Sequence, residues 1–559
     1  MKGLIWDKTF LIFNTCFSII LVNSIFAQYN EPINRNDIPH LKRQGTTMQL
    51  IVNGNPYLML AGETGNSSAS DLSYMDKIWK KIVAEHLNTL VVPIYWELIE
   101  PKEGEFDFTL VDSIITAARQ NHIKLVFLWF GTWKNSMSCY VPLWIKTNEE
   151  RFPRAREKNG RTEEILTAFN KTNRDADAYA LSHLMKHIRR FDEKEQTVVL
   201  VQIENEIGMI PTARDYCEEA DKAFNSMVPI KFINYLKTNK EKLNSYLYDL
   251  WQINGFKTKG NWKEVFGKGL ATEEIFMAWN YARYANYVAE SGKKEYPLPM
   301  YVNAALIRPG YKPGMYPSGG PLPHLMDIWK AGAPAIDFLA PDVYFQTFAE
   351  WVSKYDVPVG KSGQMYNQFF IPEVGNNQSV VNAYYAIAQH NIMGYSPFSI
   401  ESLADPSDNQ VSKGYKVLKE LTPLILANQG KGTMRGVILD SSSQVAKIKL
   451  GDFIFVCHHE YSWQYAPKTE GKNPRYGGMI IMVSPTEYYI AGRGLVVTFE
   501  TAANDGSIAG IGSLDEGKFV DGKWMPGLRM NGDQSNQGRQ MDLPGDTYSI
   551  QKVVLYNYK

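Results

Sequence analysis

Two glutamates stand where apolar segments of the chain end. Glu206 closes TVVLVQIENE (197–206) and Glu373 closes QFFIPE (368–373). In parallel-sheet barrels, side chains from the carboxyl ends of different strands meet in one place, where catalysis is built. Two carboxyl groups facing each other there can divide their work, one kept protonated and the other ionised. Cleavage of a glycosidic bond needs this pair, and a separation of about 5–5.5 Å gives retention through a covalent intermediate.

The residues beside these glutamates suggest supporting roles. Asn205 would reach the 2-hydroxyl of a sugar bound at Glu206. Glu204 is expected on the opposite face of the strand, as a structural residue. Glu63, in LAGETGNSS (60–68), follows an earlier apolar segment and would bind a hydroxyl group or cap the next helix. A strand-end glutamate is often an ion-pair partner, but two of them in this order favour catalysis.

The elements that must position these residues form a β-α repeat. Short apolar runs alternate with amphipathic stretches from about residue 50 to 425, which predicts a parallel sheet. Eight strands with helices between them fit a (β/α)8 TIM barrel with insertions at 209–270 and 310–325, on the catalytic face. A doubly wound open sheet would want a Gly-rich phosphate turn, and no G-x-G-x-x-G follows an early strand. The predicted strands are 57–62, 89–94, 124–129, 198–203, 299–304, 338–340 (leading to Tyr344), 368–372 and 392–398.

Three regions are predicted along the chain. Lys2 and Lys8 precede an apolar run that ends near Ala27, which is typical of a secretory signal peptide over 1–27 and indicates export to the periplasm or outside the cell. The run is short for a membrane span. The barrel is expected over 35–427. Period-2 alternation then predicts an all-β, sandwich-like domain over 432–559.

The composition excludes several classes of function. Lys plus Arg equals Asp plus Glu at 59 each, so the chain has no basic footprint for nucleic acid and no charged surface for an anionic membrane. Three cysteines follow the predicted signal peptide, too few for a disulfide framework. Cys139 and Cys217 would either pair or remain free thiols. No Cys/His spacing resembles a zinc site, and neither a metal nor a cofactor is expected.

Several segments resemble glycoside hydrolase family 35, the β-galactosidases. VQIENEIG (201–208) resembles the acid/base motif of that family, and VPIYWELIEP (92–101) with GEFDF (104–108) resembles its second-strand segment. PTEYYIAGRGLVVTF (485–499) is similar to the β-domain of a bacterial branch. The resemblance implies Glu206 as acid/base, Glu373 as nucleophile and Tyr344 beside the nucleophile.

The sequence departs from the family at positions that contact the sugar. The second-strand segment lacks the usual Trp-Asn-x-His-Glu-Pro, and Trp133-Lys134-Asn135 stands where Ala-Glu-Trp is common. These positions shape recognition of the sugar hydroxyls, so the departures concern the choice of sugar rather than the reaction. The residues expected to contact substrate at these strand ends, with core packing as the alternative for Trp129, are Tyr95, Trp96 (as a stacking platform), Glu97, Trp129 and Trp133.

These observations predict an exported, retaining exo-glycosidase that removes terminal β-galactosyl residues from oligo- or polysaccharides without a cofactor. One alternative is a retaining β-glucosidase on the same barrel. A different class of function is a secreted glycan-binding protein without catalysis. The expected partner is a glycan, with neither nucleic acid nor a stable membrane span.

Overall fold

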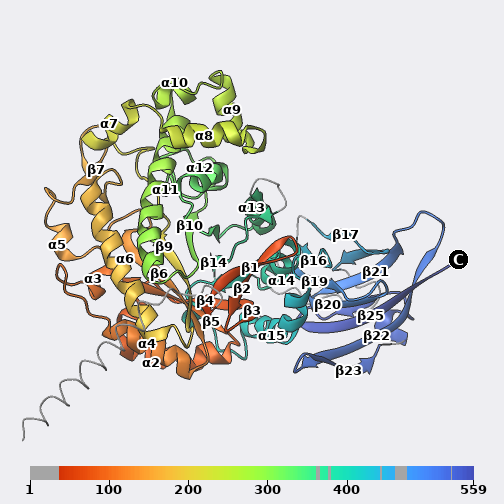
Figure 1. The fold of residues 1–559 in the computed structure, drawn as a ribbon. Coiled ribbons are helices and arrows are strands. Elements are labelled where there is room, and N and C mark those ends of the chain that lie inside the picture. The colour runs from red at the N-terminus through yellow and green to blue at the C-terminus, as the bar shows by residue number, and fades with distance from the viewer. Residues whose placement is uncertain (1–36, 360–364, 376–378, 441–442, 460–474, 531) are drawn as a thin grey trace, which may run out of the picture.

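The computed structural model describes residues 37–359, 365–375, 379–440, 443–459, 475–530 and 532–559. The proposed signal peptide lies outside these residues. The chain forms an α/β barrel followed by an all-β domain, as predicted (Figure 1).

Eight parallel strands close the barrel, each hydrogen-bonded to two neighbours. All seven residues of β5 and all eight of β9 are buried, as expected for parallel strands with helices covering their outer face. In barrel order the strands are β4 (Met59–Glu63), β5 (Thr89–Tyr95), β6 (Lys124–Lys134), β9 (Val198–Asn205), β10 (Met300–Ala305), β11 (Phe338–Val343), β14 (Ile371–Val374) and β15 (Gly394–Pro397).

Helices surround the barrel, and the longest two, α6 and α11, pack against each other on its outer side (Figure 1). Their amphipathic sequences bury one face, for example Leu181, Leu184 and Ile188 of α6. The helices are α2 (Leu72–Ala84), α3 (Trp96–Ile99), α4 (Thr109–Gln120), α5 (Leu143–Lys146), α6 (Lys171–Asp192), α11 (Leu270–Glu295), α12 (Met326–Gly332), α13 (Phe348–Tyr355), α14 (Val381–His390) and α15 (Gln410–Asn428).

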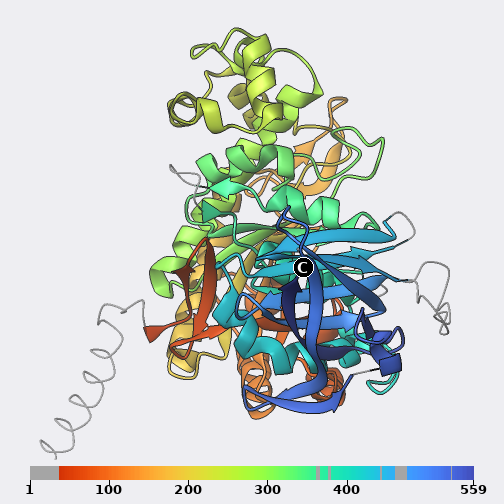
Figure 2. The same ribbon diagram turned by 90° about the vertical axis from the view of Figure 1, so that its right-hand side faces the viewer.

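The predicted insertion at 209–270 forms a group of short helices after β9. They are α7 (Glu218–Asn225), α8 (Ile230–Thr238), α9 (Ser245–Ile253) and α10 (Trp262–Phe266). Figure 2 shows this yellow-green group projecting from the barrel, well away from the blue C-terminal strands.

Small sheets accompany the barrel. Three antiparallel strands precede β4, namely β1 (His40–Gln44), β2 (Thr47–Val52) and β3 (Asn55–Tyr57). Two strand pairs lie in connecting segments, β7 (Arg154–Arg156) with β8 (Thr162–Leu166) and β12 (Pro358–Val359) with β13 (Met365–Tyr366).

The C-terminal β-domain consists of two antiparallel sheets with an apolar core between them, which includes Val437, Phe455 and Val553. The six-stranded sheet has the order β16 (Met434–Leu439), β19 (Tyr476–Met482), β20 (Glu487–Arg493), β25 (Ser549–Tyr558), β22 (Ile508–Val520) and β23 (Lys523–Arg529). The four-stranded sheet has the order β17 (Val445–Leu450), β18 (Phe453–His458), β21 (Leu495–Thr501) and β24 (Met541–Leu543).

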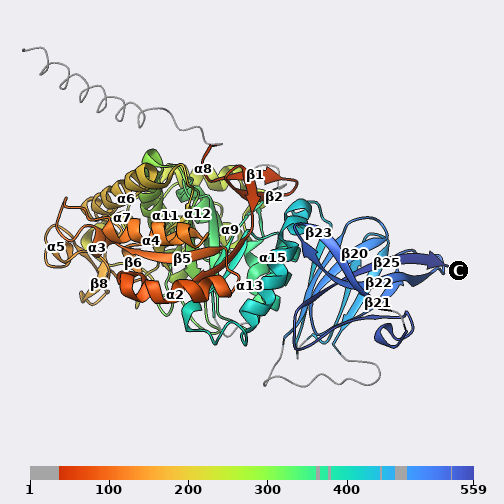
Figure 3. The same cartoon turned by 90° about the horizontal axis from the view of Figure 1, so that it is seen from below.

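The β-domain packs directly on the barrel through α14 and α15, and Figure 3 shows α15 beside strands of the β-domain. Buried side chains of the six-stranded sheet, such as Met479 and Ile481, belong to the same apolar cluster as the barrel core. The two parts therefore share one continuous core at this interface.

Two further observations concern the described residues. Cys139, Cys217 and Cys457 are free thiols, so the bridge considered between Cys139 and Cys217 is not formed. No helix in the described ranges is both long enough and apolar enough to cross a membrane.

Candidate active site

The end of β9 turns its two glutamates to opposite sides. Strict strand alternation would place residues two apart on the same face, so alternation does not separate Glu204 from Glu206. Both residues have positive φ, 59° at Glu204 and 46° at Glu206. This uncommon backbone conformation redirects the side chains. Glu204 lies in the layer outside the barrel, where it accepts a hydrogen bond from the backbone N–H of Trp133 (2.7 Å). The expectation for Glu204 is met, but by backbone conformation rather than by alternation.

Four carboxyl groups gather at the carboxyl ends of the barrel strands. Asp342 and Glu373 are paired in register on β11 and β14. The charges of Glu206 and Glu373 act on both Glu63 and Asp342. Lys134, at the end of β6, is a cation that lowers the pKa of all four carboxyls. The structure thus brings together Glu206 and Glu373, which lie 167 residues apart along the chain.

Glu206 is held by amide groups from two other strands. Asn135 donates a hydrogen bond from Nδ2 to its Oε2 (2.7 Å). The backbone N–H of Glu206 donates to Asn303 Oδ1 (2.9 Å), and Asn303 Nδ2 donates in turn to Asp342 Oδ2 (2.6 Å). Because amide groups fix both the backbone and the carboxyl of Glu206, its orientation is set before any substrate binds.

Glu373 is held by the groups that favour its ionised form. The Tyr344 hydroxyl donates a hydrogen bond to Glu373 Oε1. This bond and the Lys134 ammonium both lower the pKa of Glu373, against a larger upward effect of burial. Tyr344 is 46% exposed, whereas Glu373 is 7% and Glu206 9% exposed. The two glutamates are therefore shielded but still reachable from solvent.

Burial raises the pKa of both glutamates, but the neighbours of the two carboxyls differ. Burial and the charge of Glu373 raise the pKa of Glu206 to about 7, while Lys134 opposes the rise. Burial and the neighbouring carboxyls hold the pKa of Glu63 and Asp342 well above the ordinary carboxyl range. Burial also raises the pKa of Glu373, but there the Tyr344 hydrogen bond opposes the rise, whereas the charge of Glu373 adds to the rise at Glu206. The arrangement therefore suits Glu206 as the proton donor and Glu373 as the nucleophile.

Several buried polar atoms at this site make no hydrogen bond within the described residues. They are Glu63 Oε1, Asn205 Nδ2 and Asp342 Oδ1. The other side-chain atom of Asn205, Oδ1, accepts a hydrogen bond from Lys134 Nζ (3.0 Å). Buried polar atoms without partners are costly, so such a concentration indicates a place for a ligand with hydroxyl groups.

The three tryptophans predicted to contact substrate do not reach this site. Strand β6 continues to Lys134, five residues beyond the predicted end, so Trp129 lies within the strand. Its indole donates to Asp177 of α6 (2.8 Å). Trp133 packs on Tyr284 of α11, with ring centroids 4.5 Å apart. Both are completely buried in the helix layer, so core packing replaces the predicted role.

Trp96 is also buried rather than available for stacking. The chain turns into α3 at this residue, which directs the ring toward Trp129 and Trp144. Its indole donates to Glu100 Oε2 (2.8 Å). The predicted stacking platform is therefore wrong, because a short helix replaces the strand end.

Tyr95 ends β5 and Glu97 lies in α3, and their described contacts are with other parts of the chain. The Tyr95 hydroxyl donates to the backbone oxygen of Asn66 (2.8 Å), and the ring is 2% exposed. Glu97 forms an ion pair with Lys146 (3.2 Å). Neither contact involves the four carboxyls, and their contact with substrate stays a prediction.

Four residues of the site were not predicted as functional. Asn303 and Asp342 are polar residues inside otherwise apolar barrel strands, the same signal that identified Glu373. Lys134 and Asn135 were noticed only as departures from the family 35 pattern. Their role depends on the extension of β6 and on a shift in its pairing with β9 between Trp129 and Lys134, which no periodicity indicates.

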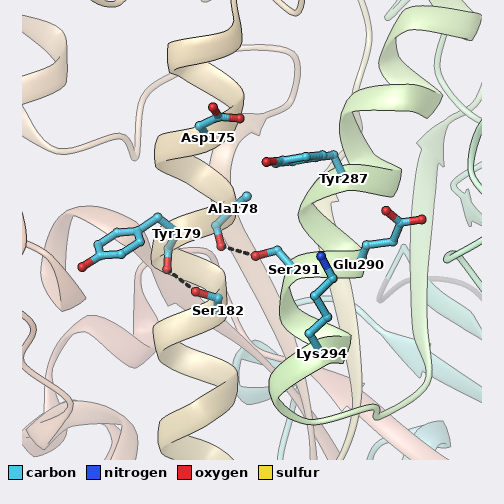
Figure 4. Close-up of a pocket in the computed structure, with 8 residues that line it drawn as sticks. All are labelled: Asp175, Ala178, Tyr179, Ser182, Tyr287, Glu290, Ser291 and Lys294. Atoms are coloured by element: carbon cyan, nitrogen blue, oxygen red, sulfur yellow. Dashed lines mark hydrogen bonds between the residues drawn. The ribbon is translucent and has the colours of Figure 1, made fainter.

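A separate groove lies on the outer surface between α6 and α11 (Figure 4). Its volume is about 220 Å³, and its lining includes Asp175, Tyr287 and Lys294. It contains none of the residues above, so it is distinct from the carboxyl cluster. Among the described residues, no group of three or more His, Cys, Asp or Glu is arranged to hold a metal ion.

Comparisons with known families agree with this geometry. Residues 69–308 match the glycoside hydrolase family 42 model, described as β-galactosidase. Residues 411–542 match a model described as a domain of unknown function, DUF5597. This part of the barrel is thus similar to glycoside hydrolases of the β-galactosidase type, and the matched family is 42 rather than 35. No curated protein matches the chain.

Solved structures with a similar fold include two bacterial β-galactosidases. The enzymes from Rahnella sp. R3 and Bacillus circulans sp. alkalophilus are each 16% identical, with TM-scores of 0.44. The similarity covers 67% and 66% of this chain but only 57% of each of those chains. A β-mannanase from the blue mussel Mytilus edulis is 15% identical over 68% of this chain and 96% of its own, with a TM-score of 0.39. At these values the similarity says nothing about the sugar or the linkage.

Proposed function

We propose that the protein is a retaining exo-glycosidase that removes terminal β-galactosyl residues from oligo- or polysaccharides. The proposal is carried by one observation: Glu206 lies in reach of the charge of Glu373, which helps to raise the pKa of Glu206, while the Tyr344 hydroxyl donates a hydrogen bond to Glu373. The match of residues 69–308 to a family described as β-galactosidase supports the choice of sugar.

The reaction follows from the groups at the site. The Glu373 carboxylate attacks the anomeric carbon while the Glu206 carboxyl gives its proton to the departing glycosidic oxygen. A covalent glycosyl-enzyme results, with Glu206 ionised. Glu206 then takes a proton from water, and the water oxygen attacks the anomeric carbon and releases Glu373. Asn135 and Asn303 keep Glu206 in place through both steps.

The charges favour a neutral sugar. The charge of Lys134 acts on all four carboxyls. A uronic acid or a sulfated sugar would add a further anion to this cluster, which is unfavourable at short range. The orphan oxygens of Glu63 and Asp342 would instead accept hydrogen bonds from sugar hydroxyls.

Two finer parts of the proposal rest on sequence. The motifs around Glu206 and in 92–108 support a relationship to family 35 alongside the matched family. The basic start and apolar run of 1–27 support export, with the enzyme acting in the periplasm or outside the cell.

The decisive test is the variant Glu373→Gln, which removes the attacking carboxylate but keeps the size of the side chain. Turnover of aryl β-galactosides is expected to be abolished while the unfolding temperature stays close to that of the wild type. A Glu373→Gln protein that retains most of its activity would refute the assignment. Glu206→Ala should be much less damaging for aryl glycosides with good leaving groups, which need no proton. Equal losses on good and poor leaving groups would contradict the acid role.

The alternatives are separated by the same assay. A panel of aryl β-glycosides distinguishes a β-galactosidase from a β-glucosidase on the same barrel. A non-catalytic glycan-binding protein would hydrolyse no member of the panel.

A further inference from the structure

A buried arginine of the β-domain joins two segments of the barrel. Arg475, directly before β19, is 9% exposed. Its Nη1 donates to Asn382 Oδ1 on α14 (2.7 Å), and its Nη2 donates to the backbone oxygen of Gln346 (2.5 Å). On the side of the β-domain, Asp440 Oδ2 lies 3.7 Å from Nη2. One guanidinium therefore links the β-domain to two barrel elements that are not consecutive in the chain.

The two linked elements carry the Tyr344–Glu373 hydrogen bond. Gln346 lies two residues after Tyr344, in the segment that leaves β11. Asn382 belongs to α14, the helix that follows β14 and Glu373. Arg475 thus links the segment that follows the donor, Tyr344, to the helix that follows the acceptor, Glu373.

The helix α14 is seated closely on the six-stranded sheet. A Cβ atom at Gly436 would lie 2.5 Å from the backbone oxygen of Tyr385, and one at Gly477 would lie 2.9 Å from Val381 Cγ1. Both contacts are shorter than real Cβ atoms allow, so glycine is required for this approach. The close packing of α14 on β16 and β19 fixes this helix relative to Arg475, which directly precedes β19.

Burial of this charge has a cost. It lowers the pKa of the Arg475 guanidinium, although the Asp440 carboxylate opposes the change. A buried charge is tolerated only when its hydrogen bonds are made, and an apolar side chain of similar size would avoid the cost. The planar guanidinium, however, can direct two donors at two fixed acceptors, which an apolar group cannot do.

We propose that Arg475 is a positioning residue through which the β-domain fixes the segment bearing Tyr344 against the strand and helix bearing Glu373. The C-terminal domain is then a structural part of the active site rather than an independent module. The kinetic part of this inference rests on the proposed function.

The test compares two buried arginines of the same interface. Arg475→Met removes the bridge, and Arg475→Lys keeps the charge but not the two-way geometry. Arg493→Met is the matched control, because Arg493 is 5% exposed and donates to Gln410 Oε1 at the start of α15 (2.6 Å) rather than to the segment after Tyr344. We expect Arg475→Met to lower kcat about 10-fold with little change in KM, since small displacements of reacting groups are costly. Arg475→Lys should fall in between, and Arg493→Met should stay within about 2-fold.

A double-mutant cycle with Tyr344→Phe tests whether Arg475 acts through Tyr344. In the Tyr344→Phe background, Arg475→Met should lower kcat by less than about 2-fold, because coupled residues are not additive. Full additivity of the two substitutions would overturn the inference. So would equal losses in Arg475→Met and Arg493→Met, which would indicate a purely structural role.

Hydrogen exchange of the backbone around 344–347 gives a readout that does not depend on activity. We expect faster exchange there in Arg475→Met than in the wild type or Arg493→Met. Unchanged exchange would overturn the inference even if the wild type is active. A wild type that hydrolyses no glycoside, combined with faster exchange in Arg475→Met, would overturn the proposed function and leave the positioning role supported.

Discussion

Glu204 and Glu206 lie two residues apart at the end of β9, and the layers around them differ in exposure and in the groups that hold each carboxyl. Outside the barrel, Glu204 faces Asp177, whose oxygens accept hydrogen bonds from Trp129 Nε1 and Thr132 Oγ1 (2.6 Å). Burial and Asp177 raise the pKa of Glu204 well above its ordinary range, so Glu204 is favoured in its neutral form. Both layers retain a buried carboxyl oxygen without a partner among the described residues, for example Glu204 Oε1 outside and Asp342 Oδ1 inside, but Glu206 is 9% exposed whereas Glu204 is completely buried.

The difference shows how a buried carboxyl becomes either structural or functional. The outer pair, Glu204 and Asp177, is completely buried and is held by donors of β6, so no ligand reaches it. In the inner group, Glu206 and Glu373 remain 9% and 7% exposed, so a ligand can reach their carboxyls.

Replacing each glutamate in turn by glutamine tests whether the two layers differ in function. Glu206→Gln should reduce kcat/KM for substrates with poor leaving groups by about 10²–10⁴-fold, the usual contribution of general acid catalysis. Glu204→Gln should leave the kinetics within about 3-fold, because an amide can still accept from Trp133 and donate to Asp177. Steady-state kinetics on purified, folded variants provide the measurement. Comparable losses in both variants would mean that the two layers are not functionally distinct.

Truncation of the outer glutamate should instead affect stability. Glu204→Ala leaves the backbone N–H of Trp133 without its acceptor and opens a cavity, at a cost of about 3 kcal/mol in the free energy of unfolding. Urea denaturation measures this cost, and kcat per folded molecule should remain near the wild-type value. A stable but inactive Glu204→Ala protein would argue against a structural role.

The pH dependence of catalysis tests whether Glu206 is the proton donor. Because the pKa of Glu206 is raised to about 7, the protonated form needed for donation predominates below pH 7 and is lost above it. For poor leaving groups, kcat/KM should fall about 10-fold per pH unit on the basic side. In Glu206→Gln this limb should disappear. A limb that persists in Glu206→Gln would belong to another group.

The smallest expected effect concerns the stability cost of the inner cluster. Folding raises the pKa of Glu63 well above 4.5, so between pH 4.5 and the raised value the unfolded state loses a proton that the folded state keeps. Stability from this group is therefore complete at low pH and decreases as the pH rises. Glu63→Gln does not titrate and should raise the unfolding temperature by about 2–4 °C at pH 7 but not at pH 4.5. An equal shift at both pH values would exclude this explanation.

The predictions made from the sequence agree with the structure where the backbone forms a regular strand. The predicted barrel strands correspond to the eight observed, and Glu206, Glu373, Tyr344, Asn205 and Glu63 lie at their ends. The errors fall where the backbone departs from a regular strand. Trp96 was misplaced because α3 begins there, and Trp129 because β6 continues past it. Asn303 and Asp342 carried the same polar-after-apolar signal as Glu373 and were predictable in principle.

The predicted division into a barrel over 35–427 and a β-domain over 432–559 stays a prediction as to its exact boundaries. The helix α15 (Gln410–Asn428) lies before the predicted boundary but packs against the β-domain, and the match to the domain of unknown function begins at residue 411. A shared core makes any single boundary arbitrary at this interface.

The amino-acid sequence by itself determined the fold class and the two glutamates, because hydrophobic periodicity and a polar residue after an apolar strand are local signals. Only the tertiary structure decided which carboxyl is held with which partner, since the four carboxyls, Lys134 and the two asparagines come from six strands or their ends. The same is true of the faces of Glu204 and Glu206, which depend on two φ angles rather than on residue type. Protonation is a property of the assembled cluster, because each pKa depends on burial and on charges that are distant in the chain.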